Sequence, residues 1–152
     1  MHELLNKMPL PPGVCWVPFE ASHLDLMDDD LADDVAMRVI DQAGRGPAGT
    51  LWVDSSPLFS VGIMDCRNGS GEVWAVIDRH RRHQYPLLVT RAIKWSIDIA
   101  AKSMNLSSVN MFVECARIDA VRWALALGFA EIGKLTIYNR PEQDHFIFSR
   151  SL

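Results

Sequence analysis

The sequence predicts a single α+β or α/β domain, in which a mixed sheet of about six to seven strands carries helices on both faces. Residues 72–129 read as strand, long helix, strand and short helix, and a crossover helix of this length joins parallel neighbouring strands. Strand patterns separated by turns precede this unit, and further strand patterns follow it. The expected order of elements is β-α-α-β-β-β-α-β-α-β-β.

Composition and charge restrict the classes of function. The 152 residues are 49% hydrophobic and 22% charged, as in ordinary globular proteins, and the net charge of -4 argues against nucleic-acid binding. No apolar run reaches the roughly 18 residues of a membrane span, and the N-terminus lacks the pattern of a secretory signal. Cys15, Cys66 and Cys115 are widely spaced and odd in number, which suits a reducing compartment. A cytoplasmic protein that is not secreted is therefore expected.

The first residues are expected to form an arm and then a small β-α unit. Residues 1–12 end in Pro9-Leu10-Pro11-Pro12, which cannot be helical, so we expect an extended N-terminal arm before a single domain at 13–152. Residues 14–18 read as a short strand, and Ser22 reads as the N-cap of a short helix.

Aspartates surround the expected start of the next helix. Apolar residues recur at helical spacing from Leu31 to Ala43, and Gly44 ends the pattern. Carboxylates at a helix N-terminus interact favourably with the helix dipole, which is one interpretation of the cluster. The alternative is an acidic patch that recruits a cationic substrate or partner. The dipole interpretation concerns Asp28, Asp29 and Asp30, and the acidic patch would add Asp33 and Asp34.

Three strands are then expected to form an antiparallel meander. Their ranges are residues 50–54, 58–65 and 72–77. Ser55-Ser56-Pro57 and Asn68-Gly69-Ser70-Gly71 are the turns between them.

The long helix is expected over residues 86–104, where Pro86 suits the first turn because its missing N–H would be unsatisfied anyway. Its apolar residues spread over a wide arc, so we expect the helix to pack on more than one side and Trp95 to lie in the core. The two apolar stripes are Leu88, Ala92, Trp95 and Ile99, and Val89, Ile93, Ile97 and Ala100.

After this helix the pattern predicts a strand at 109–114 and a short helix capped by Asp119. Gly128 is expected to end that helix in the left-handed conformation, which glycine adopts without a steric penalty. The last two strands are expected at 132–138 and 145–149.

This order of elements resembles the GNAT acetyltransferase superfamily, and the resemblance covers nearly the whole chain. It is strongest over residues 72–133, where Glu-Val-Trp-Ala-Val-Ile, a basic turn, the long helix and Ala-Leu-Gly-Phe-Ala-Glu-Ile-Gly follow the family's pattern. Among its members the chain looks most like the small GNAT-like internal virion proteins of short-tailed bacteriophages.

The resemblance implies a site for acetyl-CoA between the strands at 72–77 and 109–114, with the pyrophosphate on the turn before the long helix. Family members usually carry small residues there, because glycines let phosphate oxygens approach the backbone N–H groups. Counted from Arg82, this chain has Tyr85 and Leu87 at those places; counted from Arg81, it has Gln84 and Pro86. The binding motif is therefore degenerate. The residues expected to contact the cofactor are Val76, Ile77, Arg81, Arg82, Gln84, Tyr85, Leu87 and Arg117.

Acetyl transfer to an amine needs a base for the amine and an acid for the leaving thiolate. Family members often place a glutamate early in the strand at 72–77, so Glu72 is the candidate base; the alternative is an exposed carboxylate at a strand end. The family's tyrosine acid corresponds to Ala124, and its asparagine near the start of the same helix corresponds to Arg117. Tyr138 and Cys115 are substitutes that no sequence pattern supports.

Other chemistries are not indicated. His80 and His83 lie among arginines, which repel a metal cation, so no metal site is expected. The sequence has no P-loop, no Gly-x-Ser-x-Gly and no Cys-x-x-Cys.

Two functions stay open. The first is a virion-associated structural or host-interaction protein that retains the fold as a scaffold, with other virion proteins or further copies of itself as partners. The second is an acetyl-CoA-dependent N-acetyltransferase that acts on a small-molecule or protein amine. The missing glycines and the missing tyrosine favour the first, which would act in the cytoplasm of the host cell or in the virion.

Overall fold

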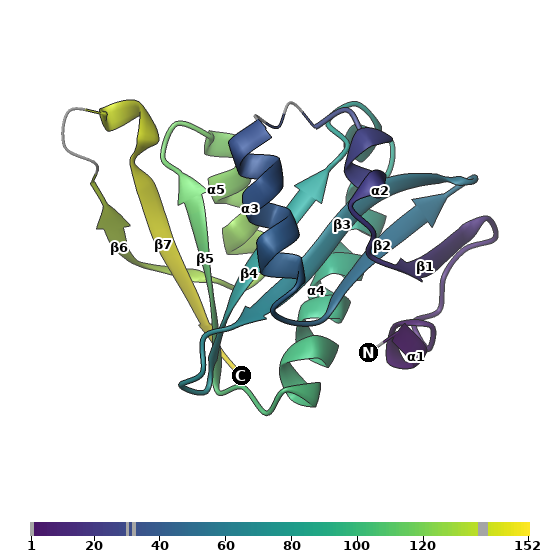
Figure 1. Ribbon diagram of the computed structural model, residues 1–152, viewed down its shortest axis with the longest axis horizontal. Coiled ribbons are helices and arrows are strands. Elements are labelled where there is room, and N and C mark those ends of the chain that lie inside the picture. The colour runs from purple at the N-terminus through teal and green to yellow at the C-terminus, as the bar shows by residue number, and fades with distance from the viewer. Residues whose placement is uncertain (1, 30, 32, 137–139) are drawn as a thin grey trace.

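One mixed sheet runs through the molecule, and in the described part of the chain it has seven strands in the order β1-β2-β3-β4-β5-β7-β6 (Figure 1). The computed structural model describes residues 2–29, 31, 33–136 and 140–152. The strands are β1 (Val14–Pro18), β2 (Ala48–Val53), β3 (Ser56–Asp65), β4 (Ser70–Ile77), β5 (Ser108–Glu114), β6 (Ala130–Leu135) and β7 (His145–Ser151). Neighbours are antiparallel except β4 and β5, which are parallel, so the expected meander and parallel pair are confirmed.

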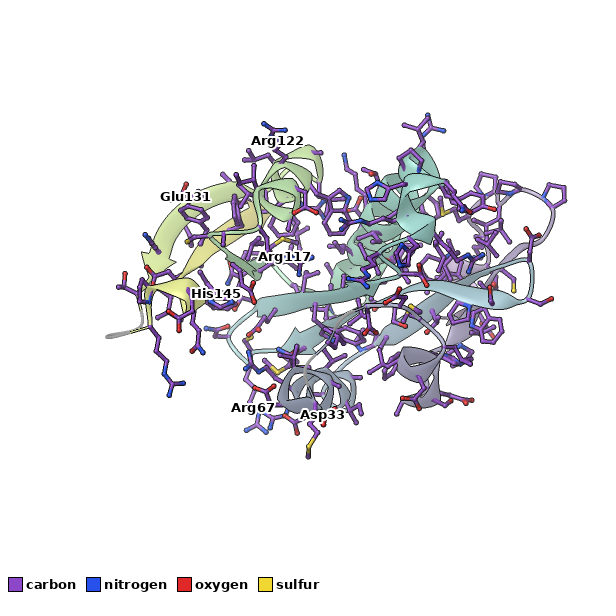
Figure 2. All side chains as sticks on the ribbon, turned by 90° about the horizontal axis from the view of Figure 1, so that it is seen from above. Asp33, Arg67, Arg117, Arg122, Glu131 and His145 are labelled. Carbon is purple, nitrogen blue, oxygen red and sulfur yellow. The ribbon has the colours of Figure 1, made fainter. Side chains whose placement is uncertain are left out.

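Helices cover both faces of this sheet, as predicted. The helical segments are α1 (His2–Leu5), α2 (Ser22–Asp25), α3 (Asp33–Ala43), η1 (Arg81–His83), α4 (Pro86–Ser103), α5 (Ile118–Ala126) and η2 (Pro141–Gln143). α4 and α5 lie on one face, and α2 and α3 lie on the other (Figures 1 and 2). Side chains alternate between the faces along β4, so Val73 joins the larger core, whereas Trp74 and Val76 join the smaller core with Val39 of α3.

A buried polar chain fixes α2 to the sheet. His23 is 6% exposed, and its Nδ1 lies 2.9 Å from the Thr50 hydroxyl, which lies 2.9 Å from the Ser60 hydroxyl. The backbone N–H of Glu20 also donates to this Nδ1 at 3.2 Å. Burial lowers the pKa of His23, and the nearby Glu20 carboxylate offsets part of this. The ring is therefore suited to remain neutral inside the smaller core.

Some element boundaries differ from those expected. Residues 2–5 form a helix rather than an extended arm, because the apolar Leu5 is completely buried in the larger core. β2, β3 and β4 each begin two residues earlier than expected, since backbone pairing continues into the turns. Tyr138, which was expected to belong to a strand, lies outside the described residues, and β6 ends at Leu135.

The expected helix caps are also corrected. Ser22 lies inside α2, and Ala21 is the N-cap without a side-chain hydrogen bond. Arg117 is the N-cap of α5, which puts Asp119 in the first turn rather than at the cap. Gly128 follows α5 with φ +89°, so the left-handed helix end is confirmed.

The aspartates before α3 divide into two groups. α3 begins at Asp33 and not at Leu31 as expected, so Asp33 and Asp34, rather than Asp28 and Asp29, occupy its first turn, where carboxylates interact favourably with the helix dipole. Asp28 and Asp29 precede the helix, and Asp28 contacts the turn after β4 instead. Asp30 lies outside the described residues.

The expectation for Trp95 is wrong. α4 contacts both β3 and α1, but Trp95 keeps 36% of its surface exposed. Trp95 is two residues from both Ile93 and Ile97, and at 3.6 residues per turn this places it on the opposite side of the helix. The buried residues of α4 are Val89, Ala92, Ile93, Ser96, Ile97, Ala100 and Ala101.

Two substitutions on α4 test this orientation. Ile97→Ala is expected to lower the free energy of unfolding by about 2–5 kcal/mol, because it leaves a cavity in the larger core. Trp95→Ala is expected to lower it clearly less, although the side chain is larger, because much of it already faces water. Urea unfolding of both variants measures the difference, and a greater loss for Trp95→Ala would refute the orientation of α4.

Candidate functional site

The parallel pair in the middle of the sheet is paired only at its start. Ser70 lies opposite Ser108, Gly71 opposite Val109, and Glu72 opposite Asn110, and the pairing ends there. β4 nevertheless continues to Ile77 beside β3, and β5 continues to Glu114 beside β7. The two strands therefore diverge toward their carboxyl ends, as Figure 1 shows.

The divergence leaves backbone groups of β4 facing the space between the strands. The N–H of Asp78 donates to the carbonyl of Leu58 in β3 at 2.9 Å. Peptide groups of an antiparallel pair point alternately toward and away from the partner strand. Counting back from Asp78, the N–H and C=O of Ile77 and Ala75 point away from β3, on the side where β5 has departed.

Asp78 organises the turn that follows β4. Its side chain is buried, and its Oδ1 accepts hydrogen bonds from the backbone N–H groups of His80 at 3.1 Å and Arg81 at 2.9 Å. Its Oδ2 accepts from the N–H of Asp28, in the segment between α2 and α3, at 3.0 Å. Burial acts to raise the pKa of Asp78, but these donors outweigh it, so the pKa lies below its usual value.

Asp28 adds side-chain contacts to the same turn. Its carboxylate lies 3.3 Å from Arg79 Nε and 2.6 Å from His80 Nε2, and its carbonyl accepts the N–H of Arg79 at 2.8 Å. The first half of the basic turn is thus held by the acidic segment between α2 and α3. These contacts place the side chains of Arg79 and His80 beside Asp28.

Arg81 supports a neighbouring hairpin. Its guanidinium donates to the carbonyls of Val53 at 2.9 Å and Pro57 at 3.1 Å and to the hydroxyl of Ser56 at 2.7 Å. These bonds hold the turn between β2 and β3 against η1. That Arg81 contacts the cofactor stays a prediction. The Arg81 guanidinium already donates hydrogen bonds to Val53, Ser56 and Pro57.

Arg82 reaches in the other direction, to α5. Its Nη2 lies 2.9 Å from Asp119 Oδ2, so the ion pair connects the turn after β4 with the first turn of α5. Burial acts to raise the pKa of Asp119, but the N–H of Ala120 and the charge of Arg82 outweigh it and lower the pKa overall. Arg117 lies exposed at the start of the same helix (Figure 2).

The start of α4 offers a small set of backbone donors. Tyr85 is the N-cap and makes no side-chain cap bond, and Pro86 at the first position has no N–H. The first N–H groups of an α-helix have no carbonyl within the helix to bond, so the N–H groups of Leu87 and Leu88 lack a partner inside α4. Tyr85 packs against the larger core, whereas Gln84 and Leu87 are exposed. Two donors remain despite the missing glycines.

Glu72 lies at the point where β4 and β5 separate, and it is not a free carboxylate at a strand end. Its Oε1 accepts a hydrogen bond from Nε2 of Gln42, a buried residue near the end of α3, at 2.9 Å. The Cys66 thiol lies nearby, and its pKa is raised by burial and then by the Glu72 and Asp65 carboxylates. Gln42 was not among the residues expected at the site, although its position three residues after Val39 indicated the inward stripe of the helix.

The other expected residues are dispersed. Val76 packs into the smaller core and Ile77 against the larger one. Ala124 is fully buried, and the half-buried Cys115 donates its backbone N–H to the carbonyl of Asp144 at 2.9 Å. Tyr138 lies outside the described residues.

The described residues hold neither a candidate metal centre nor a candidate membrane-spanning helix. They contain no group of three or more His, Cys, Asp and Glu side chains that could hold a metal ion. Within the same part of the chain, none of the helices has the length and apolarity needed to cross a membrane.

The Asp78 contacts generate a prediction with a defined pH dependence. Asp78→Asn is expected to lower the free energy of unfolding at neutral pH by about 1–3 kcal/mol, because buried N–H donors lose a charged acceptor. The folded-state pKa lies below the unfolded value, so the carboxylate contributes stability above about pH 4 and loses it as the pH falls further. Urea unfolding between about pH 7 and pH 3 should show the gap to the parent protein narrowing; a constant gap would contradict the role of the charge.

Comparisons with known proteins identify the fold. No protein-family model and no curated protein matches the sequence. A spermidine N-acetyltransferase chimera, from Vibrio cholerae and hSSAT, superposes with a TM-score of 0.68 at 16% identity, covering 91% of this chain and 95% of that one. The ribosomal-protein-S5-alanine acetyltransferase of Vibrio fischeri gives 0.66 at 14% identity, covering 94% and 95%.

An acetyltransferase of the GNAT family from Streptococcus pneumoniae is similar in the same way, with a TM-score of 0.67 at 16% identity over 91% of this chain and 99% of that one. At these identities the likeness concerns the fold. The similarity covers more than nine tenths of this chain and therefore includes the seven-stranded mixed sheet of the described residues and the helices on its faces. The chain has the GNAT fold.

Proposed function

We propose that this protein is an acetyl-CoA-dependent N-acetyltransferase. The observation that carries the proposal is the divergence of β4 and β5 beyond Glu72 and Asn110, which places a carboxylate at its base and a helix N-terminus at its open end. The fold supports this, because the similar structures bear the names of acetyltransferases. The expected virion role finds no support in those names.

The residues of the site suit the acetyl donor. The peptide groups of Ala75 and Ile77 can bond the amides of its pantetheine arm, as a neighbouring strand would. The N–H groups of Leu87 and Leu88, at a helix N-terminus, can donate to phosphate oxygens. Arg82 supplies a cation at the same end of the divergence, and a guanidinium can bind phosphate through two parallel hydrogen bonds.

Acetyl-CoA supplies an activated acetyl group as a thioester. Glu72 takes a proton from the ammonium of the acceptor, and the free amine attacks the thioester carbonyl carbon. A C–N bond forms, the nitrogen releases its second proton to solvent, the C–S bond breaks, and the thiolate of CoA leaves. Ala124 is buried and has no ionisable group, so it cannot protonate that thiolate. We infer that solvent supplies the proton that the thiolate takes up.

The acceptor is an amine whose class the fold leaves open. Spermidine and an alanine of ribosomal protein S5 appear in the names of two of the similar structures, so spermidine and a peptide that begins with alanine are the first probes to use. Association with further copies of the chain and a location in the cytoplasm remain predictions beside this proposal.

Calorimetry with acetyl-CoA tests the cofactor site. The parent protein is expected to bind with micromolar affinity, and Arg82→Ala is expected to bind about tenfold more weakly, because it removes one charge near the phosphates. The matched control is Arg122→Ala, which removes an exposed arginine on α5 (Figure 2). No heat from the parent protein at millimolar acetyl-CoA would overturn the proposal and leave the scaffold as the function of this fold.

Glu72→Gln tests the base. With spermidine or a peptide beginning with alanine as the acceptor, kcat is expected to fall by about 100-fold or more, because general base catalysis typically contributes that factor. Binding of acetyl-CoA should be unchanged, since the carboxylate acts on the amine. Release of the CoA thiol reports turnover, and full activity of this variant would remove Glu72 from the mechanism.

A further inference from the structure

We propose that Gln42 is a positioning residue for the Glu72 carboxylate, an inference that rests on the proposed function of the site. Gln42 is 8% exposed, and its amide donates to Glu72 Oε1 at 2.9 Å. The two residues come from different elements, α3 and β4, so this bond joins the helical layer to the strand where the parallel pair separates.

A buried amide in this position has an energetic cost that its partner must offset. The inward side of α3 otherwise contributes Val39, Ala36 and Ala43 to the smaller core. An apolar side chain would pack there without desolvating an amide. A hydrogen bond to a charged acceptor is among the stronger ones in proteins, and here the acceptor is the carboxylate of the proposed base.

The backbone around Gln42 is well anchored. Its carbonyl accepts the N–H of Arg45 at 3.0 Å where α3 ends, and the carbonyl of Arg45 accepts the N–H of Asp65 in β3 at 3.2 Å. The donor is therefore attached to a helix end that is itself bonded to the sheet. A carboxylate held from such a support keeps one orientation, which is what proton transfer at a defined distance requires.

The amide is also suited to its partner chemically. It is neutral over the working range of pH, so it orients the carboxylate without competing for the proton. An arginine in its place would hold the same oxygen but would favour the ionised form more strongly and weaken the base. One amide bond occupies one of about four acceptor positions of a carboxylate, which leaves others for the ammonium of the acceptor.

A double-mutant cycle distinguishes positioning from a structural role. Gln42→Met keeps a side chain of similar length without the donor, and it is expected to lower kcat for acetyl transfer to spermidine by roughly tenfold. The dissociation constant for acetyl-CoA and the melting temperature should not change. In the Glu72→Gln background the same substitution is expected to cause no further loss, because the group that it orients is gone. Arg38→Met, on the exposed side of α3, is the control and should retain parent activity.

The contact itself can be measured without turnover. In the ¹H–¹⁵N spectrum, the side-chain amide protons of Gln42 are expected to exchange slowly with water, and Glu72→Ala should accelerate that exchange. Fast exchange in the parent protein would overturn the proposal, as would equal losses from Gln42→Met in both backgrounds.

The outcomes also separate this inference from the proposed function. If Glu72→Gln loses turnover while Gln42→Met does not, only the positioning role fails. If the parent protein acetylates neither spermidine nor the alanine peptide, or if Glu72→Gln is fully active, the role of Glu72 fails and that of Gln42 fails with it.

Discussion

The structure depends on a parallel strand pair that is joined over only three residue pairs. Beyond these three pairs, β4 stays paired with β3 and β5 stays paired with β7. β4 continues along β3 until the N–H of Asp78 reaches Leu58, and β5 continues along β7 until the N–H of Cys115 reaches Asp144. A backbone N–H or C=O group that has no partner on a neighbouring strand must form a hydrogen bond with another group or with water. The divergence therefore creates the backbone donors and acceptors on which the proposed site is built.

Long-range contacts hold the open end of the divergence. Asp78 and Asp28 fasten the turn after β4 to the segment before α3, while Arg82 and Asp119 join the same turn to α5. The turn is thereby supported from both helical layers. This support explains how a turn without glycines still presents the start of α4 to the space between the strands. The donors come from Leu87 and Leu88, and carboxylates set the position of the turn.

Much of the fold could be predicted from the sequence because it is encoded locally. The bounds of β1, the helix end at Gly128 and the parallel relation of β4 to β5 follow from strand patterns, glycine conformation and crossover length. The orientation of α4 could not be predicted in the same way. Periodicity showed two apolar stripes, but only the packing of the sheet decided that Ile97 and not Trp95 would be buried.

Less of the candidate site than of the fold could be predicted from the sequence. Glu72 was identified through a resemblance, but its partner Gln42 lies thirty residues away, and the local sequence indicates only that Gln42 falls on the inward stripe of α3. Arg81 and Arg82 are adjacent in a basic turn, yet one supports a hairpin and the other reaches α5. Such differences arise from side-chain directions in the folded chain. They also explain why a run of basic residues by itself is a weak indicator of phosphate binding.

The most direct test of the central claim is a ¹H–¹⁵N titration of the protein with CoA. If the divergence of β4 and β5 is a cofactor site, the backbone amide signals of Ala75, Ile77, Leu87 and Leu88 should shift together and saturate, while those of β1 at the far edge of the sheet stay in place. Saturating CoA that leaves these four signals unmoved, or that shifts signals only elsewhere, would contradict the account.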